Sequence, residues 1–562
     1  VLNHHAPLRK KTVRVRPLVP WFSDYIKSIK RLRRKAERRW RRSHQDKDLL
    51  GYKLLRNCAS FVMNKARNSY YNSLVHENSC NPRRLFGLIN KLLKPSSKNS
   101  VPDVVNQDVV NDFAMFFSQK IENNQLNLDS LCSLTGELDG LPHKLGEQGS
   151  TVQFDHFLPL SEFDVRTLVG SVSKTYCSLD PVPTKLLVNC LDVLLPSLTK
   201  VINMSLQLGK FPQKWKEAIV LPLIKKNNAD PNNFQNYRPI SNLQYVSKLC
   251  ERAVFDQINR HMTVNLLYPP LQSAYRKNHS TETALLRVTN DILMKMNSQQ
   301  VTLLVLLDLS TAFDTVDHSI LLNRLKIRFG ITGSALAWFH SYLKGRSQCV
   351  SVNGILSDSV GWRWGVPQGS CLGPLLFLMY SSKLFDVVKY HLPNVHCYAD
   401  DTQLYLSFQP CNLIHQEQAV VAMENCIQGL RKWMLHDRLM INDAKTEFIV
   451  VGTRQQLSKL SVFSLNVGDT LVDKSSRVRN LGILFDPNLD MNEHVTKTCS
   501  SAFYHVHNIR QIRKYLSRDA LEVLIHAFVT SRLDYCNSLY YGLPNVQLAR
   551  MQRVQNAAAI GF

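Results

Sequence analysis

The sequence predicts a mixed α/β globular protein built from more than one structural unit. Its 562 residues exceed what one ordinary hydrophobic core accommodates, so we expect roughly two to four units. Its hydrophobic content of 44% and aromatic content of 9% are typical of a globular protein rather than a disordered one. From Leu160 onward, amphipathic helical patterns alternate with short apolar, strand-like runs.

The pattern divides the chain into four segments: a basic linker and helix (1–50), a helical extension with a polar connector (51–154), a mixed helix and strand region (155–486) and a helical end (487–562). Within the connector we expect one short helix around residues 109–122. The mixed region contains two clear helical patterns, at 191–208 and 281–296. It also contains two clear strand patterns, at 218–226 and 301–309.

The first hundred residues are strongly basic. They hold 25 Lys and Arg against 5 Asp and Glu, which is +20 of the chain's total +25. The run KSIKRLRRKAERRWRR, residues 27–42, carries ten basic residues and one acid. A solvated helix or a nuclear-import signal would explain such a run. A nucleic-acid partner explains ten cations around Trp40 better, because each phosphate contact releases condensed counterions.

Several protein classes are excluded. No stretch approaches the ~18 to 20 apolar residues of a membrane span, so we expect no membrane partner. The N-terminus lacks the apolar core of a secretory signal. Thirteen cysteines without a C-x-x-C pair predict neither a disulfide framework nor a zinc site. We therefore expect a reducing, intracellular compartment.

Three carboxylates stand at the ends of apolar runs. Asp400 and Asp401 in HCYADDTQLYLSF could be a surface hairpin, since Asp favours turns. Asp308 ends the run VTLLVLLDL, where it could cap a following helix. If these strands are neighbours in one sheet, the three carboxylates converge, and such hard oxygen ligands select Mg²⁺ or Mn²⁺. Two such ions support phosphoryl transfer.

A glycine-containing loop, GVPQGS, lies between these strands and leads into an apolar helix. Gly365 and Gly369 would let the backbone approach a base or sugar closely. Taken alone, the loop is better explained as an ordinary loop before a core helix.

Taken together and in order, VTLLVLLDLSTAFD, GVPQGS and YADD resemble the palm signature of reverse transcriptases. Further blocks resemble the polymerase of non-LTR (LINE-type) retrotransposons, in particular the jockey-like and chicken-repeat-like groups, from about residue 155 to the end: FPQKWKEAIVLPLIKK, NYRPISNL, LQSAYRKNHSTETALL, INDAKTEFIV and VRNLGILFD. The resemblance implies a right-hand polymerase fold with α/β fingers, an antiparallel palm sheet and a helical thumb. It implies RNA-directed DNA synthesis, copying the element's RNA into cDNA.

The resemblance also assigns the metal site. Asp308, Asp400 and Asp401 would hold two Mg²⁺ ions, with Mn²⁺ as a substitute, and Asp401 would lie next to the primer end. The backbone carbonyl of Leu309 would be a further ligand. Lys445 would protonate the departing pyrophosphate.

The remaining assignments concern the nucleotide, primer and template. The nucleotide contacts would be the finger cations Lys225 or Lys226 and Arg238, the sugar-gate residue Phe313, and Gln368 beside the template–nucleotide pair. The primer and template contacts would be Arg276, Gly365, Gly369, Leu481 and Gly482. Alternatives remain at these positions: the cations could be solvated surface residues, and Phe313 could be a core aromatic.

The implied partners are an RNA template, a DNA primer and deoxynucleoside triphosphates, with no oligomeric state indicated. The implied location is the nucleus, with a cytoplasmic ribonucleoprotein stage. HAPLRKKTVRVRP resembles the linker after an endonuclease domain, yet neither that domain nor a CCHC knuckle is present, so we expect a fragment of a longer product. Two rivals are an inactive nucleic-acid-binding remnant and an intron-maturase-like or RNA-copying polymerase.

Overall fold

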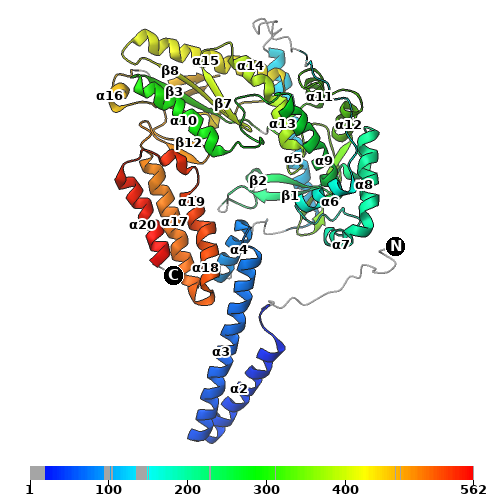
Figure 1. Ribbon diagram of the computed structural model, residues 1–562, viewed down its shortest axis with the longest axis vertical. Helices are drawn as coiled ribbons and strands as arrows, with labels where there is room; N and C mark the ends of the chain where they lie inside the picture. Colours follow the sequence, from blue (N-terminus) through cyan, green and yellow to red (C-terminus); the bar gives the residue numbers. More distant parts are fainter. Residues whose placement is uncertain are drawn as a thin grey trace. The chain divides into compact units, whose positions relative to one another are not determined.

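The computed structural model of the chain describes residues 19–93, 105–134, 151–226, 229–310, 312–461, 464–468 and 470–560, together with Pro102 and Gly149. The chain forms two compact units. Figure 1 colours the chain along its sequence, from blue at the N-terminus to red at the C-terminus. One unit combines the two ends of the chain, Val1–Ser97 and Asn492–Phe562, and the other is Lys98–Met491. The linker-like segment HAPLRKKTVRVRP lies outside the described residues.

The first unit is helical. Its helices are α2 (Asp24–Ser43), α3 (Asp46–Glu77), α4 (Pro82–Leu93), α17 (Asn492–Ile512), α18 (Arg518–Ile525), α19 (Ser531–Leu533) and α20 (Asn545–Ile560). Leu85 and Ile89 of α4 share one buried core with Val495 and Ile509 of α17. The helical end expected from residue 487 is therefore present, and it packs with helices from the N-terminal part of the chain.

The four-stranded sheet of the second unit has the strand order β7 (Asn394–Tyr398), β8 (Asp401–Phe408), β3 (Val301–Leu307) and β9 (Glu447–Val451). All three pairings are antiparallel, as expected from the sequence. β3 is central and almost wholly buried, which explains why its sequence is continuously apolar rather than alternating. Three helices pack against this sheet (Figure 1): α10 (Thr281–Asn297), α14 (Leu384–Val388) and α15 (Leu413–His436).

A second sheet is formed by β2 (Tyr237–Asn242), β1 (Glu217–Ile224), β4 (Arg346–Val352), β5 (Ile355–Leu356) and β6 (Val360–Trp362). Helix α5 (Gln107–Leu134) covers it, with Phe113 and Phe117 packed against Tyr237. This helix is longer than the short helix expected at 109–122. The expected N-terminal extension is also divided, because α3 and α4 lie in one unit and α5 in the other.

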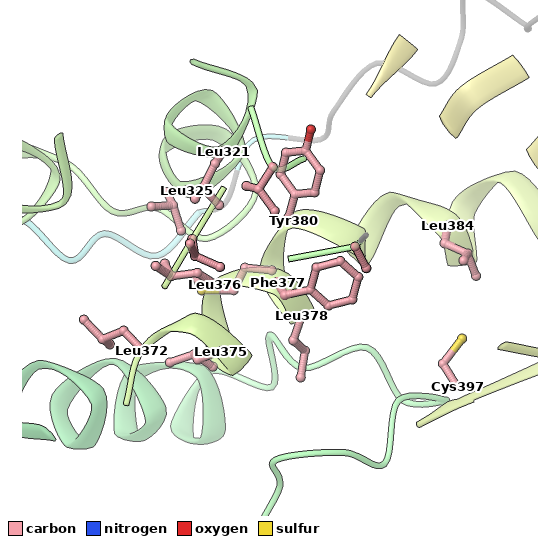
Figure 2. Packing of buried hydrophobic residues seen from close by; sticks show 14 of the residues in the cluster. Leu321, Leu325, Leu372, Leu375, Leu376, Phe377, Leu378, Tyr380, Leu384 and Cys397 are labelled. Atoms are coloured by element: carbon pink, nitrogen blue, oxygen red, sulfur yellow. The ribbon is translucent and has the colours of Figure 1, made fainter. Parts of the chain in front are cut away.

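Helix α13 (Gly373–Tyr380) is buried in the core of this unit from Leu375 to Tyr380. The remaining helices of this unit are α6 (Glu162–Ser171), α7 (Thr184–Asn189), α8 (Leu191–Gln207), α9 (Tyr245–Val264), α11 (His318–Ile327), α12 (Gly333–Leu343) and the short α16 (Arg454–Leu457). Figure 2 shows side chains of α13 beside Leu321 and Leu325 of α11. Two small hairpins complete the unit: β10 (Ser464–Val467) with β11 (Thr470–Asp473), and β12 (Val478–Asn480) with β13 (Ile483–Phe485).

None of the helices in the described part of the chain has the length and apolar character needed to cross a membrane.

A buried ion pair joins α11 to the end of α15. Arg324 and Asp437 are 3% and 1% exposed, and Nη2 of Arg324 lies 2.6 Å from Oδ2 of Asp437. Burial alone would raise the pKa of Asp437, but the hydrogen bond with His436 and the charge of Arg324 hold it below its usual value. The two opposite charges therefore neutralise each other in a site that is shielded from water.

Replacing Arg324 with Met is expected to lower the free energy of unfolding by about 3–5 kcal/mol, because it leaves the Asp437 carboxylate buried without its counter-charge. Arg328→Met is the matched control. Its ion pair with Asp386 is half-buried, so the loss should be about 1 kcal/mol or less. Denaturant unfolding of both variants measures the difference, and equal losses would contradict this account.

Candidate active site

The two adjacent carboxylates lie on a tight turn. Tyr398 pairs with Asp401 across β7 and β8, which leaves Ala399 and Asp400 as the two turn residues. Leu307 of β3 pairs with Thr402 of β8, so Asp308, one residue beyond, falls beside Asp401. The two apolar strands are therefore neighbours in one sheet, and the three carboxylates lie at the same end of it.

The three carboxylates influence one another electrostatically. Desolvation, together with the negative charge of Asp308, raises the pKa of Asp400, while Arg238 and Lys445 oppose the shift. Desolvation and the charges of Asp400 and Asp308 raise the pKa of Asp401 to about 6. A divalent cation would relieve this repulsion, and carboxylate oxygens are the donors that Mg²⁺ and Mn²⁺ prefer.

The donor set thus fits a divalent cation by charge and by chemistry. Over the residues that the structure describes, no three His, Cys, Asp or Glu side chains are already gathered into a metal-binding cluster.

Asp308 has a protein counter-ion. Lys445 Nζ lies 2.8 Å from Asp308 Oδ2, and the Asn442 side chain donates to the same oxygen at 3.3 Å. The Asn442 backbone N–H also donates to the Asp308 carbonyl at 2.8 Å. Lys445 ends the short 3₁₀-helix Asp443–Lys445, which an ion pair between Asp443 and Arg431 at 2.5 Å holds to α15. The structure thus brings Lys445 to the carboxylates.

Cations from the second sheet face the same region. Lys225 follows β1, and Arg238 lies on the neighbouring β2, paired with Leu223. Burial and the positive charges of Lys120, Arg238 and Lys445 lower the pKa of Lys225. Lys226 is exposed just beyond the end of β1. Lys120, on α5, was not foreseen from the sequence, because its helix was interpreted as part of a connector.

The GVPQGS loop docks on protein backbone. The N–H groups of Gly365 and Val366 donate to the carbonyls of Val316 and Phe313 at 2.8 and 2.9 Å. Gly365 has φ of 83°, and a Cβ there would lie 2.7 Å from the Asp314 carbonyl oxygen. The sequence predicts that this glycine lets the backbone approach a base or sugar. The close approach in the structure is to the loop after β3.

Gly369 is similarly constrained. Its φ is 123°, and a Cβ would lie 2.5 Å from the Ser241 carbonyl oxygen of β2. The preceding Gln368 accepts a hydrogen bond from Ser241 N–H at 2.7 Å and donates from its side chain to Asp314 Oδ1, also at 2.7 Å. Burial raises the pKa of Asp314 to about 6. Gln368 therefore links β2, the GVPQGS loop and the loop after β3.

Phe313 is half-buried at the margin of the core. Its ring lies 5.0 Å from that of Phe377 on α13, and it packs against the large core cluster of the unit. It retains part of its surface, so both the gate and the core interpretations remain compatible with its position.

The expected primer and template residues lie in two places. Arg276 Nη1 donates to the carbonyls of Pro269 and Gln272 at 3.1 and 3.0 Å, so it braces its own loop. Leu481 and Gly482, with φ of 43° and 93°, form the two-residue turn between β12 and β13. This hairpin is tied to β8 by a buried hydrogen bond from Asn480 to Gln403 at 2.8 Å.

Sequence reasoning missed one further contact of the carboxylate turn. Gln272, in the quoted block LQSAYRK, hydrogen-bonds the backbone of Ala399. Nothing in the residues around it, Leu271 and Ser273, points to this contact.

Comparison with known proteins matches residues 224–485 to the family described as reverse transcriptase (RNA-dependent DNA polymerase). Three similar curated proteins come from Drosophila melanogaster. The probable RNA-directed DNA polymerase from transposon BS is 30% identical over 56% of this chain and 34% of that protein. The RNA-directed DNA polymerase from mobile element jockey is 26% identical over 54% and 32%. The probable RNA-directed DNA polymerase from transposon X-element is 29% identical over 53% and 32%.

The chain therefore spans about one third of the length of these relatives. Among solved structures, apo telomerase from Candida Tropicalis, truncated from its C-terminal domain, aligns over 49% of this chain and 54% of that chain. Its sequence identity to this chain is 13% and its TM-score is 0.33.

Proposed function

Residues 224–485 belong to the reverse transcriptase family of jockey-like non-LTR retrotransposons, and from that premise we propose that this chain copies RNA into DNA. The substrates would be an RNA template, a DNA primer and deoxynucleoside triphosphates. The RNA of the element that encodes the chain would be the natural template. The family predicted from the sequence motifs is thereby confirmed, while the activity of the whole protein is a proposal.

One observation carries the proposal: two carboxylates at the β7–β8 turn and one just after β3 lie at the same end of one sheet, with cations facing them. Asp308, Asp400 and Asp401 supply the negative groups. Lys225, Arg238 and Lys445 supply positive charge within electrostatic range of one another. Phosphoryl transfer needs positioning and charge neutralisation above all, and this arrangement offers both.

Two Mg²⁺ ions, when held by Asp308, Asp400, Asp401 and the Leu309 carbonyl, would favour ionisation of the primer 3′-hydroxyl and neutralise the leaving pyrophosphate. The protein's own groups do the rest. Lys225 and Arg238 would bind the triphosphate oxygens of the incoming nucleotide, with Lys226 as an alternative contact. Lys445, an ammonium beside Asp308, would give its proton to the departing pyrophosphate.

Other residues would position the nucleic acid. Gln368 would contact the template–nucleotide pair. It lies in the GVPQGS loop, and its side chain is hydrogen-bonded to Asp314 in the loop after β3. The turn Leu481–Gly482 would support the primer, because its hairpin is tied to β8 next to Asp401. Arg276, Gly365 and Gly369 would act by shaping the loops that the template crosses, since their present contacts are with protein backbone.

Incorporation of labelled dTMP on poly(rA)–oligo(dT) by the purified chain tests the proposal. Incorporation that requires Mg²⁺ or Mn²⁺ is expected. Its absence in a folded protein that still binds the hybrid would favour the inactive remnant.

Helix α2 is the proposed contact with the phosphate backbone. A hollow of about 740 Å³ along it is lined by Ser43 and by six cations, Arg31, Arg34, Lys35, Arg38, Arg39 and Arg42. The helix is held by its apolar side. Ile26 and Ile29 are buried, and Trp40 stacks on Tyr52 of α3 with ring centroids 5.7 Å apart. The basic residues are therefore presented by a folded element. The same residues support the proposed nuclear location, with a cytoplasmic stage bound to RNA.

Replacing Arg31, Arg34, Arg38 and Arg42 with Gln is expected to weaken RNA binding and flatten its salt dependence. Each lost phosphate contact lowers the slope of log K against log[salt] by about 0.7 for single-stranded RNA. The matched control removes four exposed lysines of the other unit, Lys174, Lys185, Lys200 and Lys210, and thus the same net charge. Equal slopes for the two variants would show that α2 has no special role.

A further inference from the structure

The turn that presents Asp400 contains an unfavourable backbone conformation. Ala399, the first of its two residues, has φ of 60°. In this region the Cβ of an L-residue crowds the backbone, which is why two-residue hairpins of this kind favour glycine at that position. The chain has alanine there, so another group must stabilise the turn.

The side chain of Gln272 contacts both polar groups of that backbone. Its Oε1 accepts hydrogen bonds from the N–H groups of Ala399 and Ala274, each at 3.0 Å. Its Nε2 donates to the Ala399 carbonyl at 3.1 Å. Gln272 is 1% exposed, so water does not compete for these bonds. The Gln272 amide thus hydrogen-bonds both the N–H and the carbonyl of Ala399.

The backbone of Gln272 is itself fixed against β7. Ser273 N–H donates to the Cys397 carbonyl at 3.0 Å, and Cys397 N–H donates to the Leu271 carbonyl at 2.9 Å. Arg276 donates to the Gln272 carbonyl at 3.0 Å. The backbone that carries the Gln272 amide is therefore fixed to β7. A shift of Ala399 would break its hydrogen bonds to that amide.

We propose that Gln272 is a positioning residue, which holds Ala399 in the left-handed conformation and so directs the Asp400 carboxylate toward Asp308. Gln272 acts through the backbone of Ala399 and touches no substrate. The inference rests on the proposed function, because it concerns the same carboxylates. It adds a residue whose only connection to the chemistry is the shape of the turn.

The test compares Gln272→Met with Gln416→Met. Gln416 is also buried, at 2% exposed, and also hydrogen-bonds backbone groups, but around Pro410 and Ser461. Both variants lose a buried amide of the same size. We expect Gln272→Met alone to weaken Mn²⁺ binding by about 10- to 100-fold, the effect of losing a group that orients a metal ligand. Mn²⁺ binding is measured by electron paramagnetic resonance on the protein with a chain-terminated primer–template, so that no turnover is required.

A second substitution separates positioning from general stability. Glycine adopts φ of 60° without the Cβ penalty. Adding Ala399→Gly to Gln272→Met should therefore recover most of the lost Mn²⁺ affinity, whereas adding it to Gln416→Met should change nothing. Gln272→Asn keeps an amide on a side chain one methylene shorter and should behave like Gln272→Met, so it serves where the Met variant does not fold.

Unchanged Mn²⁺ affinity in folded Gln272→Met or Gln272→Asn would overturn the proposal, as would failure of Ala399→Gly to restore it. The proposed function fails separately, if the wild-type chain binds Mn²⁺ and primer–template but adds no nucleotide. In that case a weakened Mn²⁺ affinity in Gln272→Met would still support the positioning role.

Discussion

Replacing Asp400 with Asn is expected to lower RNA-templated DNA synthesis by several orders of magnitude while RNA binding persists. The substitution hardly changes the shape of the side chain but removes one anionic oxygen from the group formed with Asp308 and Asp401. Metal-assisted phosphoryl transfer depends on that charge, so the loss should appear in kcat rather than in binding. Primer extension under single-turnover conditions measures it.

Loss of folding is not expected to explain the effect. The pKa of Asp400 is raised by burial and by the charge of Asp308, so its ionised form is unfavourable in the folded protein. Asn at this position should therefore leave the unfolding temperature unchanged or raise it. Asp473→Asn, the same chemical change at an exposed end of β11, is the control. Near-normal extension by Asp400→Asn would contradict the metal-binding assignment.

Replacing Phe313 with Val is expected to raise ribonucleotide incorporation by roughly 10- to 200-fold relative to deoxynucleotide incorporation, the equivalent of about 1–3 kcal/mol of lost discrimination. Phe313 follows Asp308 by five residues and is half-buried. An aromatic ring beneath the sugar would exclude the ribose 2′-hydroxyl and offer it no hydrogen bond, and this hydroxyl is what distinguishes the two sugars. Competition between rNTPs and dNTPs on one RNA template measures the ratio.

The competing interpretation is that Phe313 only packs on the core, where it meets Phe377. It predicts that Phe313→Val lowers stability and reduces both activities together. Phe154→Val provides the comparison, because Phe154 is another half-buried aromatic packed on the same core cluster and is not assigned to the nucleotide. An unchanged rNTP-to-dNTP ratio in folded Phe313→Val would end the gate assignment.

The palm could be predicted because its signals are local. The apolar run 301–307, the paired carboxylates and the strand-like residues around them each specify an element, and antiparallel pairing of those elements brings Asp308 to Asp401. The glycines at 365 and 369 predict a close approach to a base or sugar, whereas the close approaches in the structure are to protein backbone. Their partners could not be foreseen, since these are backbone carbonyls of Asp314 and Ser241, which are distant in sequence.

The remaining features depend on contacts between distant segments. Nothing in the residues around Leu85 indicates that they share a core with Val495. Lys120 gains its place near Lys225 only because the aromatic residues of α5 pack on the second sheet. The role proposed for Gln272 likewise requires knowing that its segment lies beside β7, and that Ala399 has a positive φ.

The central claim is that RNA dictates the DNA that this chain makes. The most direct measurement is single-nucleotide addition to a DNA primer on four RNA templates that differ only at the templating base. The account predicts that each template directs addition of its complementary dNMP in the presence of Mg²⁺, and that Asp400→Asn adds none. Addition that ignores the templating base, or no addition by folded protein bound to the primer–template in either Mg²⁺ or Mn²⁺, would contradict it.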